Sequence, residues 1–128
     1  MDIKRWNTQA VGRSQTVALG PLLWTVANAR DRTADFAAQT AETFARLNQA
    51  LVDAGSSRAH LLSVQVLLLD MKDRIAFDAL WCEWVGPNPQ HWPQRSCFQA
   101  TLAPGLLLEL VVTAARTEDC VQALPVVG

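Results

Sequence analysis

The chain has 128 residues, of which 50% are apolar and 18% charged, and its formal net charge is −1. This length suits one domain with its own core and is short for two. The apolar content excludes a disordered chain, and the balanced charge gives no broad basic surface for nucleic acid or an anionic membrane. We expect one domain over 1–128, with part of its apolar surface covered by another subunit.

The N-terminal residues lack the apolar core of a signal peptide, and no apolar stretch approaches the ~20 residues that span a bilayer. We therefore expect a cytoplasmic protein. Its three cysteines, Cys82, Cys97 and Cys120, are an odd number without the spacing of metal ligands. They predict reduced thiols rather than a disulfide framework or a zinc site.

Three strands are predicted in the first part of the chain. Residues 3–8 form a candidate first strand. Segments 15–19 and 22–27 flank the strong turn signal Gly20-Pro21, so we expect them to pair as a hairpin.

Two amphipathic helices and a central strand follow. The first helix begins after a cap at Thr33 or Asp35 and ends at Gly55. Segment 61–69 is apolar and too short for a buried helix, so it predicts a central strand, and the second helix lies within 70–86. The apolar faces of the two helices contain Phe36, Thr40, Phe44, Leu47 and Leu51 in the first and Phe77, Leu80, Trp81 and Trp84 in the second.

Two further strands end the pattern. Segment 93–102 alternates, with Arg95 and Cys97 on a polar face, and segment 106–116 is mainly apolar, with Glu109 as its only acid. The short turn between the segments predicts an antiparallel hairpin. The order β-β-β-α-β-α-β-β predicts an α+β fold, with the two helices packed on one face of a mixed sheet.

Arg95 and Glu109 are charges within apolar strands, and each needs a partner, a ligand or water. In the predicted hairpin, their different distances from the turn separate them by more than ~10 Å. One small ligand would then meet Arg95 of one subunit and Glu109 of another. The alternatives are a surface ion pair for Arg95 and an interfacial ion pair for Glu109.

The segment from Pro93 to Ala115 resembles the Rid family of reactive intermediate deaminases, also called the YjgF family. The resemblance rests on Pro-x-Arg-Ser-Cys, then Leu-x-Pro-Gly, then an apolar strand with one Glu. It extends upstream through Leu-Leu-Leu-Asp-Met-Lys-Asp at 67–73 and Phe-Asp-Ala-Leu-Trp at 77–81. Overall it covers about 12–116.

The resemblance implies a chorismate-mutase-like fold, a homotrimer with clefts between subunits, and no metal or organic cofactor. It implies hydrolysis of reactive enamine and imine acids, such as 2-aminoacrylate, to 2-keto acids and ammonia. In that reading Arg95 grips the substrate carboxylate, Glu109 positions water, and Cys97 lines the cleft. Because no His lies beside Cys97 in the sequence, we expect a lining thiol rather than a nucleophile.

Four residues at substrate-contacting positions depart from the resemblance. Arg13 stands where the family commonly has Tyr, and Val26-Ala27 replace Ser-Gly. Asp78 replaces Asn and adds a negative charge. These changes predict an altered pocket around a retained carboxylate clamp, which leaves two alternatives open. The chain is a non-catalytic protein that senses small carboxylates, or a pathway-specific enzyme that acts on an imine-like intermediate.

Overall fold

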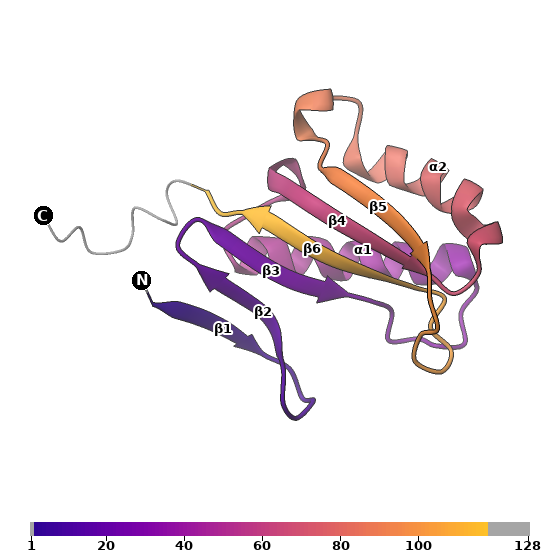
Figure 1. The fold of residues 1–128 in the computed structure, drawn as a ribbon, viewed down its shortest axis with the longest axis horizontal. Coiled ribbons are helices and arrows are strands. Elements are labelled where there is room, and N and C mark those ends of the chain that lie inside the picture. The colour runs from indigo at the N-terminus through magenta and orange to yellow at the C-terminus, as the bar shows by residue number, and fades with distance from the viewer. Residues whose placement is uncertain (1, 118–128) are drawn as a thin grey trace, which may run out of the picture.

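Six strands form one mixed sheet, and two helices pack across it (Figure 1). The computed structural model describes residues 2–117. Single 3-10 turns precede β4, α2 and β5. In chain order, the strands and helices are β1 (Ile3–Asn7), β2 (Ser14–Leu19), β3 (Leu22–Ala27), α1 (Phe36–Asp53), β4 (Leu61–Leu68), α2 (Arg74–Val85), β5 (Gln94–Gln99) and β6 (Leu108–Ala115). The predicted element order is confirmed, and the tail segment 118–128, which includes Cys120, lies outside the described residues.

The helices end where the sequence signals indicate. Asp35 caps α1, because its Oδ1 accepts a hydrogen bond from the backbone N–H of Ala38 at 2.9 Å. Gly55, with φ of 78°, lies just past the end of α1, and Gly86, with φ of 82°, follows α2. Both positions take a left-handed backbone that only glycine adopts at low cost.

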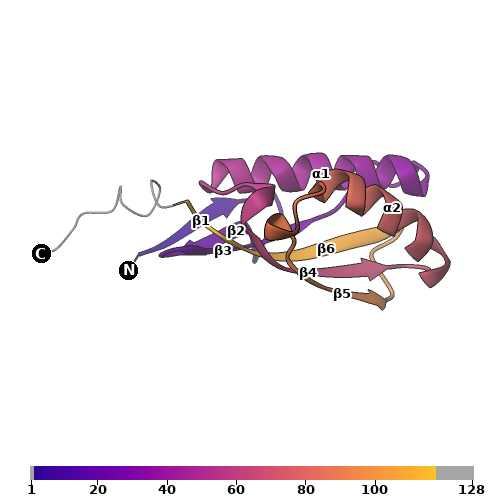
Figure 2. The ribbon, with the colours of Figure 1, turned by 90° about the horizontal axis from the view of Figure 1, so that it is seen from above.

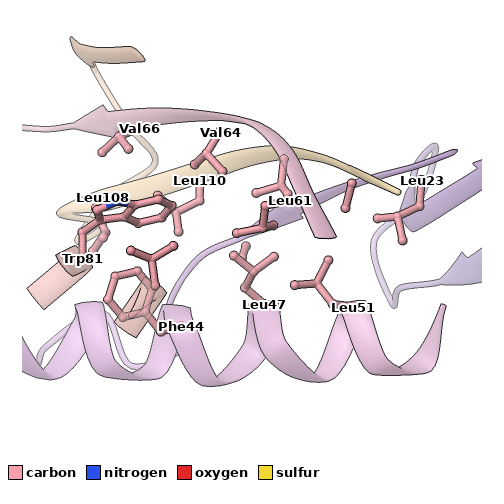
Figure 3. Close-up of a cluster of buried hydrophobic side chains, with 14 of the residues drawn as sticks. Leu23, Phe44, Leu47, Leu51, Leu61, Val64, Val66, Trp81, Leu108 and Leu110 are labelled. Atoms are coloured by element: carbon pink, nitrogen blue, oxygen red, sulfur yellow. The ribbon is translucent and has the colours of Figure 1, made fainter. Parts of the chain in front are cut away.

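The core lies between the helices and one face of the sheet (Figure 3). Leu47 and Leu51 of α1 point toward Leu23 of β3 and Leu61 of β4, and all four are buried. Burying each such leucine contributes about 1.5–3 kcal/mol. Aromatic rings join the two helices, with Phe44 of α1 stacked on Trp84 of α2 at a centroid distance of 4.8 Å. The predicted apolar helix faces are therefore the core.

The predicted hairpin of the last two strands is wrong. The sheet order is β1-β2-β3-β6-β4-β5, so β4 lies between β5 and β6. β5 runs parallel to β4 at the sheet edge, and the chain then crosses the end of β4 to add β6 on its other side. Ala100 donates its N–H to Leu68 O, and Leu69 donates to Leu107 O, which fixes both ends of the crossing.

Gln39 holds this crossing against α1. Its Nε2 donates to Gly105 O at 2.9 Å, and its Oε1 accepts the N–H of Leu107 at 3.0 Å. Gly105 has φ of 84°, and a Cβ built there would lie 2.6 Å from the Cβ of Arg32. The Pro-Gly pair is thus a tight bend against a neighbouring loop rather than a hairpin turn.

The second face of the sheet is left open. Figure 2 shows both helices on the same side of the strands. The open face carries large apolar side chains that remain exposed, including Trp24 at 41% and Phe98 at 51%. Its other exposed apolar side chains are Ile3, Leu19 and Val26. Such a surface is unusual for a protein that stays monomeric.

Candidate functional site

The strand register places Arg95 and Glu109 on opposite faces of the sheet. Arg95 pairs with Val64 of β4, and Glu109 pairs with Leu67. Residues directly opposite one another on neighbouring strands share a face, and successive residues alternate. Val64 is fully buried beneath the helices, whereas Leu67 lies on the open face. One chain therefore cannot bring Arg95 and Glu109 to one ligand.

Arg95 and Glu109 are far apart, as the predicted hairpin required, but the cause is the strand order rather than a hairpin. The two residues differ by three positions along β4 and lie on strands two apart. At ~3.3 Å per residue and ~4.8 Å per strand, the offset is about 10 Å along the strands and about 10 Å across them. The body of the sheet separates them as well.

Arg95 lies against α2 in an aromatic and acidic setting. Its Nη2 lies 2.6 Å from Asp78 Oδ1, and its guanidinium carbon lies 5.4 Å from the Phe77 ring centroid and 5.6 Å from that of Trp81. These ring distances fit cation–π contacts. The side chain is 19% exposed. The face predicted to be polar thus turns toward a helix, and its arginine already has an acidic partner.

A pocket of about 380 Å³ opens beside this ion pair. Its walls are mainly apolar, and Arg95 and Asp78 are the charged residues among those that line it. Trp92 is fixed there, because its Nε1 donates to Gly86 O at 2.9 Å. The remaining lining residues are Trp81, Cys82, Val85, Gly86 and Pro93.

Cys97 shares the face of Arg95 but does not line this pocket. It pairs with Val66 of β4 and packs against the core. It is a partly buried free thiol. The cysteine that lines the pocket is instead Cys82 of α2, for which the sequence predicted no role in a site.

Glu109 has an amide partner on the open face. Asn28, just past the end of β3, donates from Nδ2 to Glu109 Oε1 at 3.0 Å. Arg46 of α1 donates to the carbonyl of Asn28 at 2.7 Å. The pKa of Arg46 lies below its usual range, mainly because the guanidinium is partly desolvated and secondly because Arg30 repels it. The sequence did not predict Asn28 as a partner of Glu109, and the only signal for it was its position just after a predicted strand.

The loop that carries Asn28 is anchored by Glu42 of α1. Its carboxylate accepts the backbone N–H groups of Arg30 at 2.7 Å and Asp31 at 3.2 Å. These two hydrogen bonds, that from Arg30 first, hold the pKa of Glu42 below its ordinary value of 4.5. The charged form of Glu42 therefore stabilises the loop beside Glu109.

The other predicted contact residues lie at three different places. Val26 is exposed on the open face, opposite Val111 of β6, whereas Ala27 faces the core. Arg13 is exposed in the connection between β1 and β2. Among the predicted site residues, the structure brings Arg95 and Asp78 into direct contact within one chain. It also places Val26 on the same face of the sheet as Glu109.

Among residues 2–117, acidic, histidine and cysteine side chains form no group of three that could hold a metal ion. Within the same range, neither helix has the length and apolar character needed to cross a membrane.

Comparisons with known proteins place the chain in a family. The family model described as endoribonuclease L-PSP matches residues 4–116. A RutC family protein of Haemophilus influenzae is 34% identical over 77 residues, which are 59% of this chain and 65% of that protein, a little under two thirds of its length. The RutC family protein YoaB of Escherichia coli K12 is 34% identical over 83 residues, 64% of this chain and 71% of YoaB.

A solved structure agrees with these matches. NMB1025 of Neisseria meningitidis, a member of the YjgF protein family, superposes with a TM-score of 0.83 at 30% identity. The superposition covers 92% of this chain and 98% of that chain. The six-stranded sheet with two helices on one face, together with the match over 4–116, shows that the chain belongs to the endoribonuclease L-PSP family, the YjgF or Rid family that its motifs resemble.

Proposed function

We propose that this protein hydrolyses reactive enamine and imine acids to 2-keto acids and ammonia, in a cleft between two copies of the chain. The observation that carries the proposal is the guanidinium of Arg95, fixed by Asp78 and two aromatic rings beside a mainly apolar pocket. A planar guanidinium holds a carboxylate through two charge-assisted hydrogen bonds, which Lys reproduces poorly. Arg95 therefore orients the substrate by its carboxylate.

The reaction needs orientation and proton transfer rather than a covalent nucleophile. An enamine acid first becomes the imine, as a proton moves from its nitrogen to its β-carbon. Water then adds its oxygen to the C=N carbon, the resulting carbinolamine loses ammonia, and a C=O bond replaces the C=N bond. Glu109 accepts the proton that water loses and supplies one to the departing nitrogen. The hydrogen bond from Asn28 leaves the second oxygen of the Glu109 carboxylate available for this water.

The two faces of the sheet support a site shared between copies. Because Arg95 and Glu109 of one chain lie on opposite faces, a cleft that contains both takes each from a different copy. The exposed apolar side chains of the open face supply a surface for assembly. We propose a homotrimer, in which the edge of one sheet meets the open face of the next.

A specific observation favours a second candidate function. Arg95 is already paired with Asp78, and Val26-Ala27 offer no side-chain hydroxyl to a ligand. A site of this kind suits a non-catalytic protein that binds small carboxylates, or an enzyme specialised for one imine-like intermediate. The endoribonuclease named in the family model is less well supported, because a net charge of −1 offers little attraction to a phosphate backbone.

The test compares keto-acid release from imino acids generated in situ, including 2-aminoacrylate. Wild type should accelerate release over buffer, and Arg95→Ala should lose about 100-fold in kcat/KM because the substrate is no longer oriented. Arg58→Ala is the matched control, since Arg58 also stacks over a ring, at 6.0 Å from Trp84, but lines a different groove. No acceleration by wild type with any imino acid would overturn the deaminase proposal. Binding of 2-ketobutyrate without turnover would favour the carboxylate sensor.

A further inference from the structure

The ion pair between Arg95 and Asp78 gives the pocket two charges of opposite sign at one end. Asp78 Oδ1 lies 2.6 Å from Arg95 Nη2, and the Asp78 side chain is 42% exposed. Its other oxygen lies 3.7 Å from Nε of the exposed Arg74. Both members of the pair line the pocket, so a bound molecule meets a carboxylate as well as a guanidinium.

This pairing reduces the attraction of the pocket for a simple anion. A monocarboxylate that approaches Arg95 is repelled by the adjoining Asp78, and the pair of Arg95 and Asp78 carries no net charge. The nearby Arg74 side chain is 55% exposed, so its charge is screened by solvent. A guanidinium has five N–H donors, and its contact with Asp78 leaves others available. A carboxylate still finds hydrogen bonds at Arg95, but a purely anionic ligand gains little from long-range attraction.

A zwitterion fits the same pair much better. In an iminium acid the carboxylate and the protonated nitrogen are attached to the same carbon, so the two charges lie a few ångströms apart. Placing the carboxylate on Arg95 brings the N–H within reach of the neighbouring Asp78 carboxylate. That contact favours the protonated imine, which is the form that water attacks.

The remaining walls indicate what the rest of the substrate is. Trp81, Val85, Trp92 and Pro93 form an apolar lining, and the volume of about 380 Å³ exceeds the needs of a three-carbon acid. Apolar and aromatic walls with few convergent polar groups are typical of sites for bulky apolar ligands. A substrate that fills this space carries a large apolar or aromatic side chain.

We propose that Asp78 sets substrate specificity by holding the iminium nitrogen while Arg95 holds the carboxylate, so that the site selects zwitterionic imino acids with bulky apolar side chains over plain carboxylates. This inference rests on the proposed deaminase function for the identity of the substrate. Asp78 is a binding residue in it, and no covalent step passes through its carboxylate.

The test uses two stable probes that share a benzyl side chain. Phenylpyruvate is a simple anion, and L-phenylalanine presents a carboxylate beside a cationic nitrogen. By calorimetry, wild type should bind L-phenylalanine more tightly than phenylpyruvate. Asp78→Asn should tighten phenylpyruvate binding and weaken L-phenylalanine binding, changing the ratio of the two dissociation constants by at least tenfold.

Asp73→Asn is the matched control. It makes the same chemical change at the start of the same helix, where the Asp73 side chain makes no capping hydrogen bond, and it alters the net charge equally. Its binding ratio should match that of wild type. Asp78→Ala serves as a second variant, and circular dichroism confirms that each variant is folded. A ratio that changes less than twofold in both Asp78 variants would overturn the inference.

The outcomes separate this inference from the deaminase proposal, because the binding ratio requires no turnover. If wild type releases no keto acid but the ratio still depends on Asp78, the deaminase proposal fails and the specificity role of Asp78 stands. If keto acid is released and the ratio is insensitive to Asp78, the reverse holds. With turnover established, Asp78→Asn should raise KM for the benzyl imino acid more than it lowers kcat.

Discussion

Both faces of the sheet carry apolar side chains, but only one of them is buried within the chain. On the helix side of β6, alternate residues such as Leu108, Leu110 and Val112 are buried within one chain. On the open side, Val111 is only partly buried and Trp24 of the adjoining strand is 41% exposed. The helices α1 and α2 cover the first face, which stabilises the folded chain, and neither of them covers the second. We therefore propose that the open face serves assembly between copies rather than folding.

Each face also presents one half of the proposed chemistry. Arg95 meets an aspartate and two aromatic rings on the helix side, whereas Glu109 meets an asparagine amide on the open side. In the proposed reaction, the arginine binds the substrate and the glutamate keeps an oxygen for water. The proposed catalytic unit is then the contact between copies, so variants on either face test it.

The largest effect is expected from charging the open face. Trp24→Glu should convert the assembly to monomers of 14.1 kDa, because a buried unpaired carboxylate at the interface is strongly destabilising. Sedimentation measures the mass, and keto-acid release should disappear with assembly. Ile75→Glu is the control, since Ile75 is 86% exposed on α2 and should leave the mass unchanged. An oligomer that survives Trp24→Glu would show that the open face is not the interface.

Neighbouring residues of β6 should differ in the kind of stability they provide. Leu110→Ala should lower the free energy of unfolding by about 2–5 kcal/mol, because it leaves a cavity beneath the helices. Val111→Ala should cost less, and its cost should rise with protein concentration, because the lost contact stabilises only the assembled state. Urea unfolding at two protein concentrations checks both. Equal, concentration-independent losses would remove the distinction between the faces.

Mixing two inactive variants should restore activity if each cleft takes Arg95 and Glu109 from different copies. Arg95→Ala and Glu109→Gln subunits, unfolded together and refolded at equal amounts, give about one quarter of clefts with both native side chains. Each variant alone should have a kcat/KM about 100-fold below wild type, whereas the co-refolded mixture should recover about a quarter of wild-type activity. The control mixes the two proteins without unfolding. No recovery after co-refolding would show that Arg95 and Glu109 share no cleft.

The smallest effect is expected from Glu42 of α1, which anchors the loop beside Glu109. Glu42→Gln removes the charge that accepts the N–H groups of Arg30 and Asp31, and at pH 7 it should cost less than about 1 kcal/mol. Because the folded pKa of Glu42 lies below 4.5, wild type has this stabilisation above that value and loses it as pH falls through the lowered pKa.

Thermal melts between pH 3 and 7 should therefore show a flatter acid limb for Glu42→Gln. Glu83→Gln on α2 is the matched control, because Glu83 is an exposed helical glutamate in the other helix. If both variants flatten the acid limb equally, the loop anchored by Glu42 contributes no specific pH dependence.

Local sequence signals predicted the elements well because each depends on residues close together in the chain. The periodic apolar positions Phe44, Leu47 and Leu51, capped by Asp35, predicted α1, and all three are buried. Alternation correctly put Arg95 and Cys97 on one face of β5. The overall fold class followed from the element order, and the family match supports it.

Pairing between distant segments could not be read in the same way. The bend around Gly105 looks like a hairpin turn in the sequence, because its contacts with Gln39 and Arg32 are more than 60 residues away along the chain. For the same reason nothing local indicated that Asp78 reaches Arg95 or that Asn28 reaches Glu109. The sequence predicted individual residues of the candidate site, but the residues that contact them could be identified only once the fold was known.

The parallel pairing of β5 with β4 has a consequence for how this protein can change over time. Deleting one residue from the connection 86–93 would slide β5 by one position, turning Arg95 outward and Gln94 or Ser96 toward α2. Point substitutions at Gln94 or Ser96 leave that arrangement intact. We therefore expect the spacing between α2 and Arg95 to be constrained as strongly as the arginine itself, so that insertions or deletions there are selected against.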